Sequence, residues 1–180
     1  VDWSMSKGLV TIIDFHGAKL KENFLYTFDQ SDINGINYYS DPTSAKRIAD
    51  LNKFKAIWRD IAERFKDYPE TLLFEVFNEP YFWLSANEIS TISSDIINIV
   101  RSSGSNNESR KIIVTGGDTN SWEVIFQIPN DLINSDPNLI ATFHYYQPMS
   151  FTSSMQENNN NFNLSQNAKN QITQRFSQIN

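Results

Sequence analysis

Hydrophobic residues follow two alternating patterns along the chain. Short, almost continuously apolar runs are typical of buried β-strands, and they occur at residues 9–15, 72–77, 111–115 and 139–143. Between these runs, apolar residues recur every three or four positions, which predicts amphipathic helices, the two longest at residues 44–66 and 85–102. Short strands that alternate with helices predict an α/β fold, in which helices cover a parallel sheet.

The same spacing assigns an apolar face to each long helix. In the first helix this face consists of Ile48, Leu51, Phe54, Ile57, Trp58, Ile61 and Phe65. In the second helix it consists of Ile89, Ile92, Ile96, Ile97 and Val100. Shorter helices are expected around residues 121–127 and over residues 1–7, where Gly8 suits a C-terminal cap.

The composition changes near residue 153 to asparagine, glutamine and serine, with four consecutive asparagines at 158–161. This change predicts a loop from residue 153 to 170 and a last helix over residues 168–179. We therefore expect two regions, residues 1–152, which contain the strands, and residues 153–180.

Titratable residues follow three of the predicted strands. His16 and His144 each come directly after one, and Glu79 occupies the equivalent position after the second strand, where Asn78 precedes it. The carboxyl ends of parallel strands share one face, so these side chains are expected to converge there as a catalytic site. Each also has a structural interpretation: a histidine after a strand is commonly a hydrogen-bonded structural residue, and Asn-Glu-Pro is a common turn sequence.

The neighbours of these residues add detail. Aromatic residues at positions 81–83 would desolvate the carboxyl of Glu79 and suit it to general acid catalysis. Asp14 lies two residues before His16, hence on the same face of the strand, and is expected to orient a neighbour. Glu75 is expected to be an interior carboxylate paired with a cation.

Charge and composition exclude several other functions. The net charge is −6 and basic clusters are absent, which argues against nucleic acid and anionic membrane surfaces as partners. No apolar run approaches the roughly 18 residues of a membrane span. The sequence has no cysteine, no histidine spacing typical of a metal site and no Gly-x-Ser-x-Gly motif, so neither a metal, a cofactor nor a serine nucleophile is expected.

Four segments resemble glycoside hydrolase family 5, the cellulase and mannanase family of (β/α)8 barrels. They resemble the ends of its third to sixth strands in order: Ile12-Ile13-Asp14-Phe15-His16-Gly17-Ala18, Phe74-Glu75-Val76-Phe77-Asn78-Glu79-Pro80, Arg110-Lys111-Ile112-Ile113-Val114-Thr115-Gly116-Gly117 and Thr142-Phe143-His144-Tyr145-Tyr146-Gln147-Pro148. The resemblance implies a partial (β/α)8 TIM barrel of about four consecutive βα units. It also implies extracellular hydrolysis of a β-1,4-glucan or related polysaccharide.

The resemblance also implies roles for individual residues. Glu79 is the catalytic acid/base, and Asn78 bonds the sugar 2-hydroxyl in the transition state. His144 and Tyr146 line the subsite at the scissile bond, while His16 and Trp83 contact the sugar. The implied mechanism retains configuration and uses two carboxylates about 5–5.5 Å apart.

One departure from the family pattern limits this expectation. The family nucleophile is a second glutamate after a later strand, but the last glutamate here is Glu157, in the asparagine-rich segment. A closed (β/α)8 barrel typically needs about 250 residues. We therefore expect a truncated chain that does not hydrolyse its substrate alone and that self-associates through exposed strand edges.

Two other interpretations stay open. The first is a non-catalytic carbohydrate-binding remnant of such a barrel, with aromatic platforms at Tyr81, Trp83, Trp122 and Tyr145. The second is a purely structural half-barrel.

Overall fold

The computed structural model separates the chain into two compact units, Val1–Phe143 and His144–Asn180, and each unit is described here by itself. The residues that the structure describes are 1–16, 43, 45–78, 86–116, 128–146, 152 and 165–177. The predicted boundary at residue 152 stays a prediction.

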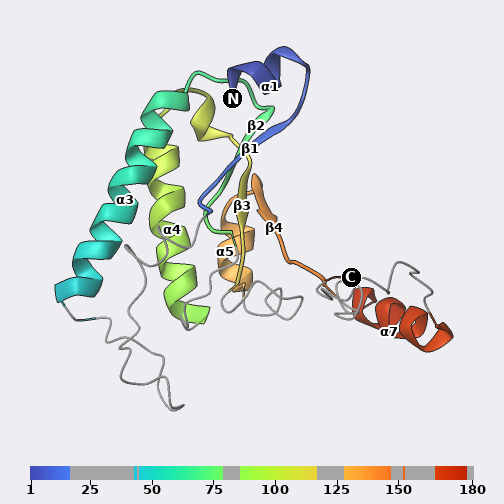
Figure 1. Ribbon diagram of the computed structural model, residues 1–180. Helices are drawn as coiled ribbons and strands as arrows, with labels where there is room; N and C mark the ends of the chain where they lie inside the picture. The colour runs from blue at the N-terminus through green and yellow to red at the C-terminus, as the bar shows by residue number, and fades with distance from the viewer. Residues whose placement is uncertain are drawn as a thin grey trace. The chain divides into compact units, whose positions relative to one another are not determined.

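The first unit is built on a four-stranded parallel sheet (Figure 1). Its strands lie in sequence order: β1 (Thr11–Asp14), β2 (Leu72–Glu75), β3 (Ile112–Val114) and β4 (Leu139–Ala141). The helices of this unit are α1 (Asp2–Ser6), α3 (Ala45–Phe65), α4 (Ala86–Ser102), the 3-10 helix η2 (Ser105–Glu108) and α5 (Asn130–Ser135). This is the arrangement of consecutive βα units in a (β/α)8 barrel, as the sequence predicts.

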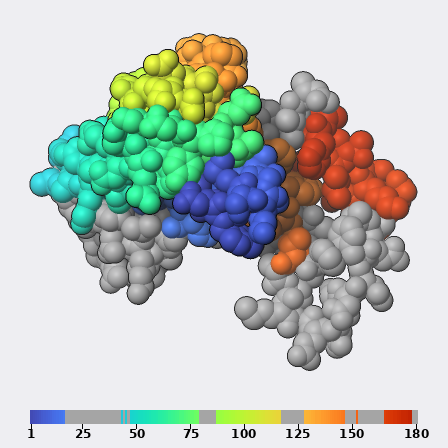
Figure 2. Space-filling model, turned by 90° about the horizontal axis from the view of Figure 1, so that it is seen from above, coloured from blue at the N-terminus to red at the C-terminus, as the bar shows by residue number. Residues whose placement is uncertain are grey.

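The hydrophobic core lies between the sheet and helices α3 and α4. Alternate residues of β2 and β3 point to the helices and are fully buried, namely Leu72, Phe74, Ile112 and Val114. Every residue of the predicted apolar face of α4 is buried. Figure 2 shows the surfaces of α3 and α4 side by side, and a 2.6 Å ion pair between Lys55 and Asp95 joins them.

The predicted apolar face of α3 is wrong at its first position. Ile48 is 49% exposed, whereas the neighbouring Arg47 is buried and lies 3.7 Å from Glu88 of α4. The buried face of the helix runs through Arg47, Phe54 and Trp58, and Ile48 lies about 100° around the helix from Arg47. The ion pair of Arg47 and Glu88 therefore occupies the position on the buried face of α3 at which the sequence predicts Ile48.

Two short elements differ from the sequence prediction. Residues 103–110 contain the 3-10 helix η2 with a buried asparagine, Asn107, in a polar stretch for which the sequence predicts no helix or strand. Helix α5 begins after Pro129, in a segment for which the sequence predicts no helix. The predicted helix around residues 121–127 lies outside the described residues.

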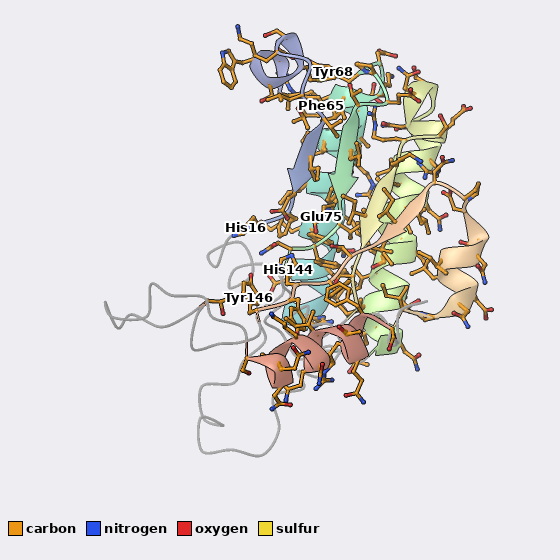
Figure 3. The ribbon with its side chains drawn as sticks, turned by 90° about the vertical axis from the view of Figure 1, so that its right-hand side faces the viewer. His16, Phe65, Tyr68, Glu75, His144 and Tyr146 are labelled. Carbon is orange, nitrogen blue, oxygen red and sulfur yellow. The ribbon has the colours of Figure 1, made fainter. Side chains whose placement is uncertain are left out.

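A buried arginine joins the amino-terminal ends of the strands. Arg110 is 1% exposed, and its guanidinium donates to the carbonyl oxygens of Phe65, Tyr68, Pro69 and Leu72 at 2.7–3.0 Å. The remaining donor, Nε, bonds Oδ1 of Asn107, so all five N–H groups have acceptors. Figure 3 shows Phe65 and Tyr68 at the opposite end of the sheet from His16. Arg110 therefore ties the turn between α3 and β2 to the start of β3.

A second arginine connects α4 to the segment before β4. Arg101 donates from Nε to Oδ2 of Asp136 at 2.7 Å and from Nη1 to the carbonyl of Asn107 at 2.6 Å. The backbone N–H of Asn138 donates to Oδ1 of Asp136 at 2.8 Å. Burial opposes ionisation of Asp136, but the hydrogen bonds from Arg101 and Asn138 outweigh it and hold the pKa of Asp136 below its ordinary value.

This lowered pKa predicts a pH-dependent stability. The stabilisation that ionised Asp136 gives the fold is present in full above about pH 4, the ordinary pKa range of an aspartate. It is lost as the pH falls through the lower pKa that Asp136 has in the folded state. Asp136→Asn is expected to lower the free energy of unfolding by about 1–2 kcal/mol at pH 7, and the difference from wild type should narrow below about pH 4. Urea titrations of both proteins between pH 2.5 and 7 measure this difference in unfolding free energy.

The more exposed ion pair of Lys55 and Asp95 provides a control. Asp95→Asn is expected to cost about 0.5 kcal/mol or less at pH 7. If Asp136→Asn loses the same unfolding free energy at every pH from 7 to 2.5, the stabilisation does not come from the ionised carboxylate of Asp136.

Candidate active site

The carboxyl ends of β1 and β2 bring two of the predicted site residues together. Beyond the paired strands, the N–H of Phe15 donates to the carbonyl of Glu75, and the N–H of Asn78 donates to the carbonyl of Phe15, each at 3.4 Å. His16 follows Phe15 directly, so His16 and Asn78 stand on neighbouring chain segments at one edge of the sheet. Figure 3 shows His16 at this end.

His16 contacts the carboxylate of Asp14. Its Nδ1 lies 2.9 Å from Oδ2 of Asp14, and the side chain of His16 is 68% exposed while that of Asp14 is 23% exposed. This is the kind of orienting contact that the sequence predicts for Asp14. The imidazole therefore has one nitrogen held by the protein and its other nitrogen, Nε2, available to a ligand.

Aromatic rings support these two strand ends from the helical layer. Phe54 of α3 contacts Phe15 edge-on with centroids 4.7 Å apart, and it stacks on Phe77 with centroids 5.0 Å apart. Phe15 precedes His16, and Phe77 precedes Asn78. One buried ring of α3 therefore packs against both residues that position the candidate site.

The end of β3 contributes a residue that the sequence analysis did not propose. Thr115 follows β3 directly and is buried at the same edge as His16 and Asn78. Its signal in the sequence is that it is the one polar residue at the carboxyl end of the apolar run 112–115. The ladder also continues beyond β4, since the N–H of Thr142 donates to the carbonyl of Val114 at 3.0 Å.

The second unit begins with the other predicted pair, His144 and Tyr146. Their rings meet edge-on with centroids 6.0 Å apart, and Oη of Tyr146 lies 3.4 Å from Nδ1 of His144. Tyr146 is half exposed, and its carbonyl accepts a hydrogen bond from Oγ1 of Thr152. These two side chains therefore form a local pair, as residues of one subsite would.

A helix packs against this segment. Helix α7 (Gln166–Phe176) places Phe176 edge-on to Tyr145, with centroids 5.6 Å apart. The predicted loop over residues 153–170 is wrong at its end, because Oγ of Ser165 caps the helix by accepting from the N–H of Ala168 at 3.2 Å. Tyr145 thus contacts protein on part of its ring, whereas Tyr146 presents more surface to solvent.

Two of the predicted site residues, Glu79 and Trp83, lie outside the described residues, as do Tyr81 and Trp122. Their assignments stay predictions. Among the residues that the structure does describe, no group of three or more histidine, cysteine or acidic side chains could hold a metal ion. Within that same part of the chain, no helix is long and apolar enough to cross a membrane.

A surface groove of about 480 Å³ lies away from the strand ends. It is lined by residues of α3 and α4, including Arg59, Glu63 and Ser102, in the outer helical layer. None of the residues expected to carry the chemistry lines it, so it is not the candidate active site.

Comparison with known proteins gives consistent matches. The family model described as "Cellulase (glycosyl hydrolase family 5)" matches residues 1–179. Endoglucanase H of Acetivibrio thermocellus is 39% identical over 153 residues, which are 84% of this chain and 14% of that protein. A xyloglucan-specific endo-β-1,4-glucanase from a metagenomic library, solved with cellotriose, is 30% identical with a TM-score of 0.69, covering 99% of this chain and 50% of the other.

Another solved structure, described as an endoglucanase, is 26% identical with a TM-score of 0.71 and covers 99% of this chain and 51% of that chain. The chain therefore spans about half the length of these solved structures, and a smaller share of Endoglucanase H.

Proposed function

Because the chain belongs to glycosyl hydrolase family 5, the cellulase family, we propose that it carries the acid/base half of an endo-β-1,4-glucanase site. The observation that carries this proposal is the placement of His16 and Asn78 on adjacent segments at the carboxyl ends of β1 and β2. Asn78 begins the Asn-Glu-Pro motif, so Glu79 is the next residue in the sequence.

The proposed mechanism divides the chemistry between two carboxylates. Glu79 gives its proton to the glycosidic oxygen as that bond breaks and the second carboxylate bonds the anomeric carbon. Glu79 later takes a proton from the water that displaces this carboxylate and releases the sugar. Asn78 bonds the 2-hydroxyl, and His16, Trp83, His144 and Tyr146 contact the substrate. The nucleophile is a second glutamate that is not among these 180 residues.

The substrate proposed is a β-1,4-linked glucan. Several curated relatives are named as endoglucanases, and one solved relative as xyloglucan-specific. A polymeric substrate places the reaction outside the cell. Association through the exposed β1 segment, where Leu9, Val10 and Ile12 are accessible, stays a prediction.

The proposal is tested by measuring binding and turnover on the same preparation. We expect the chain to bind cellotetraose and to release no reducing ends from carboxymethyl cellulose or mannan, because one of the two required carboxylates is missing. Asn78→Ala should weaken binding by about 5- to 30-fold, corresponding to a lost hydrogen bond of about 1–2 kcal/mol. Isothermal titration calorimetry and a reducing-end assay measure the two quantities.

Asn98→Ala, on the exposed face of α4, is the matched control and should bind like wild type. Hydrolysis that disappears in Glu79→Gln would refute the claim that the second carboxylate is missing. Binding without turnover would equally fit the non-catalytic sugar-binding remnant, which the accessible side chains of His16 and Tyr146 favour. The absence of binding would leave only the structural half-barrel.

A further inference from the structure

We propose that Asp14 is a positioning residue that fixes the tautomer of His16. In this assignment Nδ1 of His16 carries the proton and donates it to Asp14, and Nε2 is an unprotonated acceptor that faces solvent at the carboxyl end of the sheet. This inference rests on the proposed function. It adds that His16 would accept a hydrogen bond from a sugar hydroxyl through Nε2.

The backbone places the two side chains on one face. Residues two apart in a strand point to the same side of the sheet, and Asp14 is paired with Glu75 in the parallel register. Phe15, between them, has both its N–H and its carbonyl hydrogen-bonded to the neighbouring segment. The 2.9 Å contact therefore starts from a backbone that is hydrogen-bonded to the neighbouring segment through Phe15.

The acceptor in this pair determines which nitrogen carries the proton. A carboxylate can only accept, so the nitrogen that contacts it must be N–H, and a neutral imidazole then leaves its other nitrogen as an acceptor. The other oxygen of Asp14, Oδ1, is buried and has no hydrogen-bond partner among the described residues. The carboxylate of Asp14 is largely buried, and the hydrogen bond that the structure shows for it is the one with His16.

The second histidine provides an internal comparison. Nδ1 of His144 faces the phenol of Tyr146 at 3.4 Å, and a phenol can donate as well as accept. His144 therefore serves as a second imidazole whose contact within its own unit is known. Since the chain contains two histidines, their ring nitrogens give two sets of signals that can be separated completely.

The experiment is a long-range ¹H–¹⁵N correlation spectrum of the imidazole rings at pH 8, with His16→Gln to assign the signals. We expect wild-type His16 to be mainly in the Nδ1–H form, although free histidine in water favours Nε2–H. Asp14→Ala should return His16 to the Nε2–H form, and Asp14→Asn, which keeps a carbonyl acceptor, should retain part of the Nδ1–H population. His144 should be unchanged in all variants.

A wild-type spectrum with His16 mainly in the Nε2–H form overturns the inference, and this result needs no variant to fold. An unchanged His16 pattern in Asp14→Ala overturns it as well. A role of Asp14 limited to stability would not change the tautomer of His16 in a folded variant.

Titration with cellotetraose separates this inference from the proposed function. Asp14→Ala should weaken binding by about 3- to 10-fold if His16 accepts from the sugar. A changed tautomer with unchanged affinity supports the positioning role and removes His16 from the proposed sugar site. An unchanged tautomer refutes the positioning role whatever the affinity.

Discussion

Replacing Arg110 with methionine is expected to lower the free energy of unfolding by about 3–5 kcal/mol. Methionine fills much of the same space but donates no hydrogen bond, so the carbonyls of Phe65, Tyr68, Pro69 and Leu72 and the amide oxygen of Asn107 all lose the guanidinium as a donor. The carbonyls of Phe65 and Pro69 keep a backbone donor, and that of Tyr68 keeps the side-chain amide of Asn106. The guanidinium also lies over the ring of Phe74, 5.0 Å from its centroid, and this contact is lost too. Urea denaturation followed by tryptophan fluorescence measures the loss.

Two further variants make the test specific. Arg110→Lys keeps a positive charge but offers three donors from one point, so it should recover only part of the loss. Arg59→Met removes an exposed arginine from α3 and should change the free energy of unfolding by about 0.5 kcal/mol or less. Equal effects at Arg110 and Arg59 would show that the buried donors contribute little to stability.

The second large effect is expected at Phe54. Phe54→Ala removes a fully buried ring that contacts Phe15, Phe77 and Trp58, and it should cost about 3–5 kcal/mol of unfolding free energy. Because Phe15 and Phe77 precede His16 and Asn78, we also expect faster hydrogen exchange at the amides of Phe15 and Asn78. Denaturation and amide exchange by NMR measure the two effects.

Ile48→Ala is the matched control in the same helix. Ile48 is half exposed, so its loss should cost about 0.5 kcal/mol or less and leave the exchange of both amides unchanged. Phe54→Leu, which keeps part of the volume, should cost about 1–2 kcal/mol. If Phe54→Ala is destabilised but the two amides keep their protection, Phe54 supports the core and not the strand ends.

The parts of the fold that follow from local patterns could be predicted from the sequence. The four strands and helices α3 and α4 are present as predicted, because the spacing of apolar residues in each element follows the positions that the element buries. The sequence predicts the first strand to begin too early. Leu9 and Val10 continue its apolar run, but both are exposed and precede the residues of β1 that pair with β2. An apolar run alone does not show where a neighbouring strand stops pairing.

The features that depend on distant contacts could not be predicted. In the sequence Arg110 ends a polar turn, and nothing there indicates that backbone carbonyls from residues 65–72 surround it. The packing of Phe54 on Phe15 and Phe77 likewise joins three segments far apart in the chain. The contact of Asp14 with His16 could be expected, because it needs only the two-residue period of a strand.

The acceptors of Arg110 have a consequence for how this region can vary. Four of the five are main-chain carbonyls, which every amino acid carries, so the arginine recognises the path of the backbone and not the side chains. Substitutions at the exposed positions of the turn before β2 should be tolerated as long as the backbone keeps its course. Arg110 and Asn107, whose side chains make the contacts, should be the positions of this network that accept the fewest replacements in a saturation mutagenesis screen for folded protein.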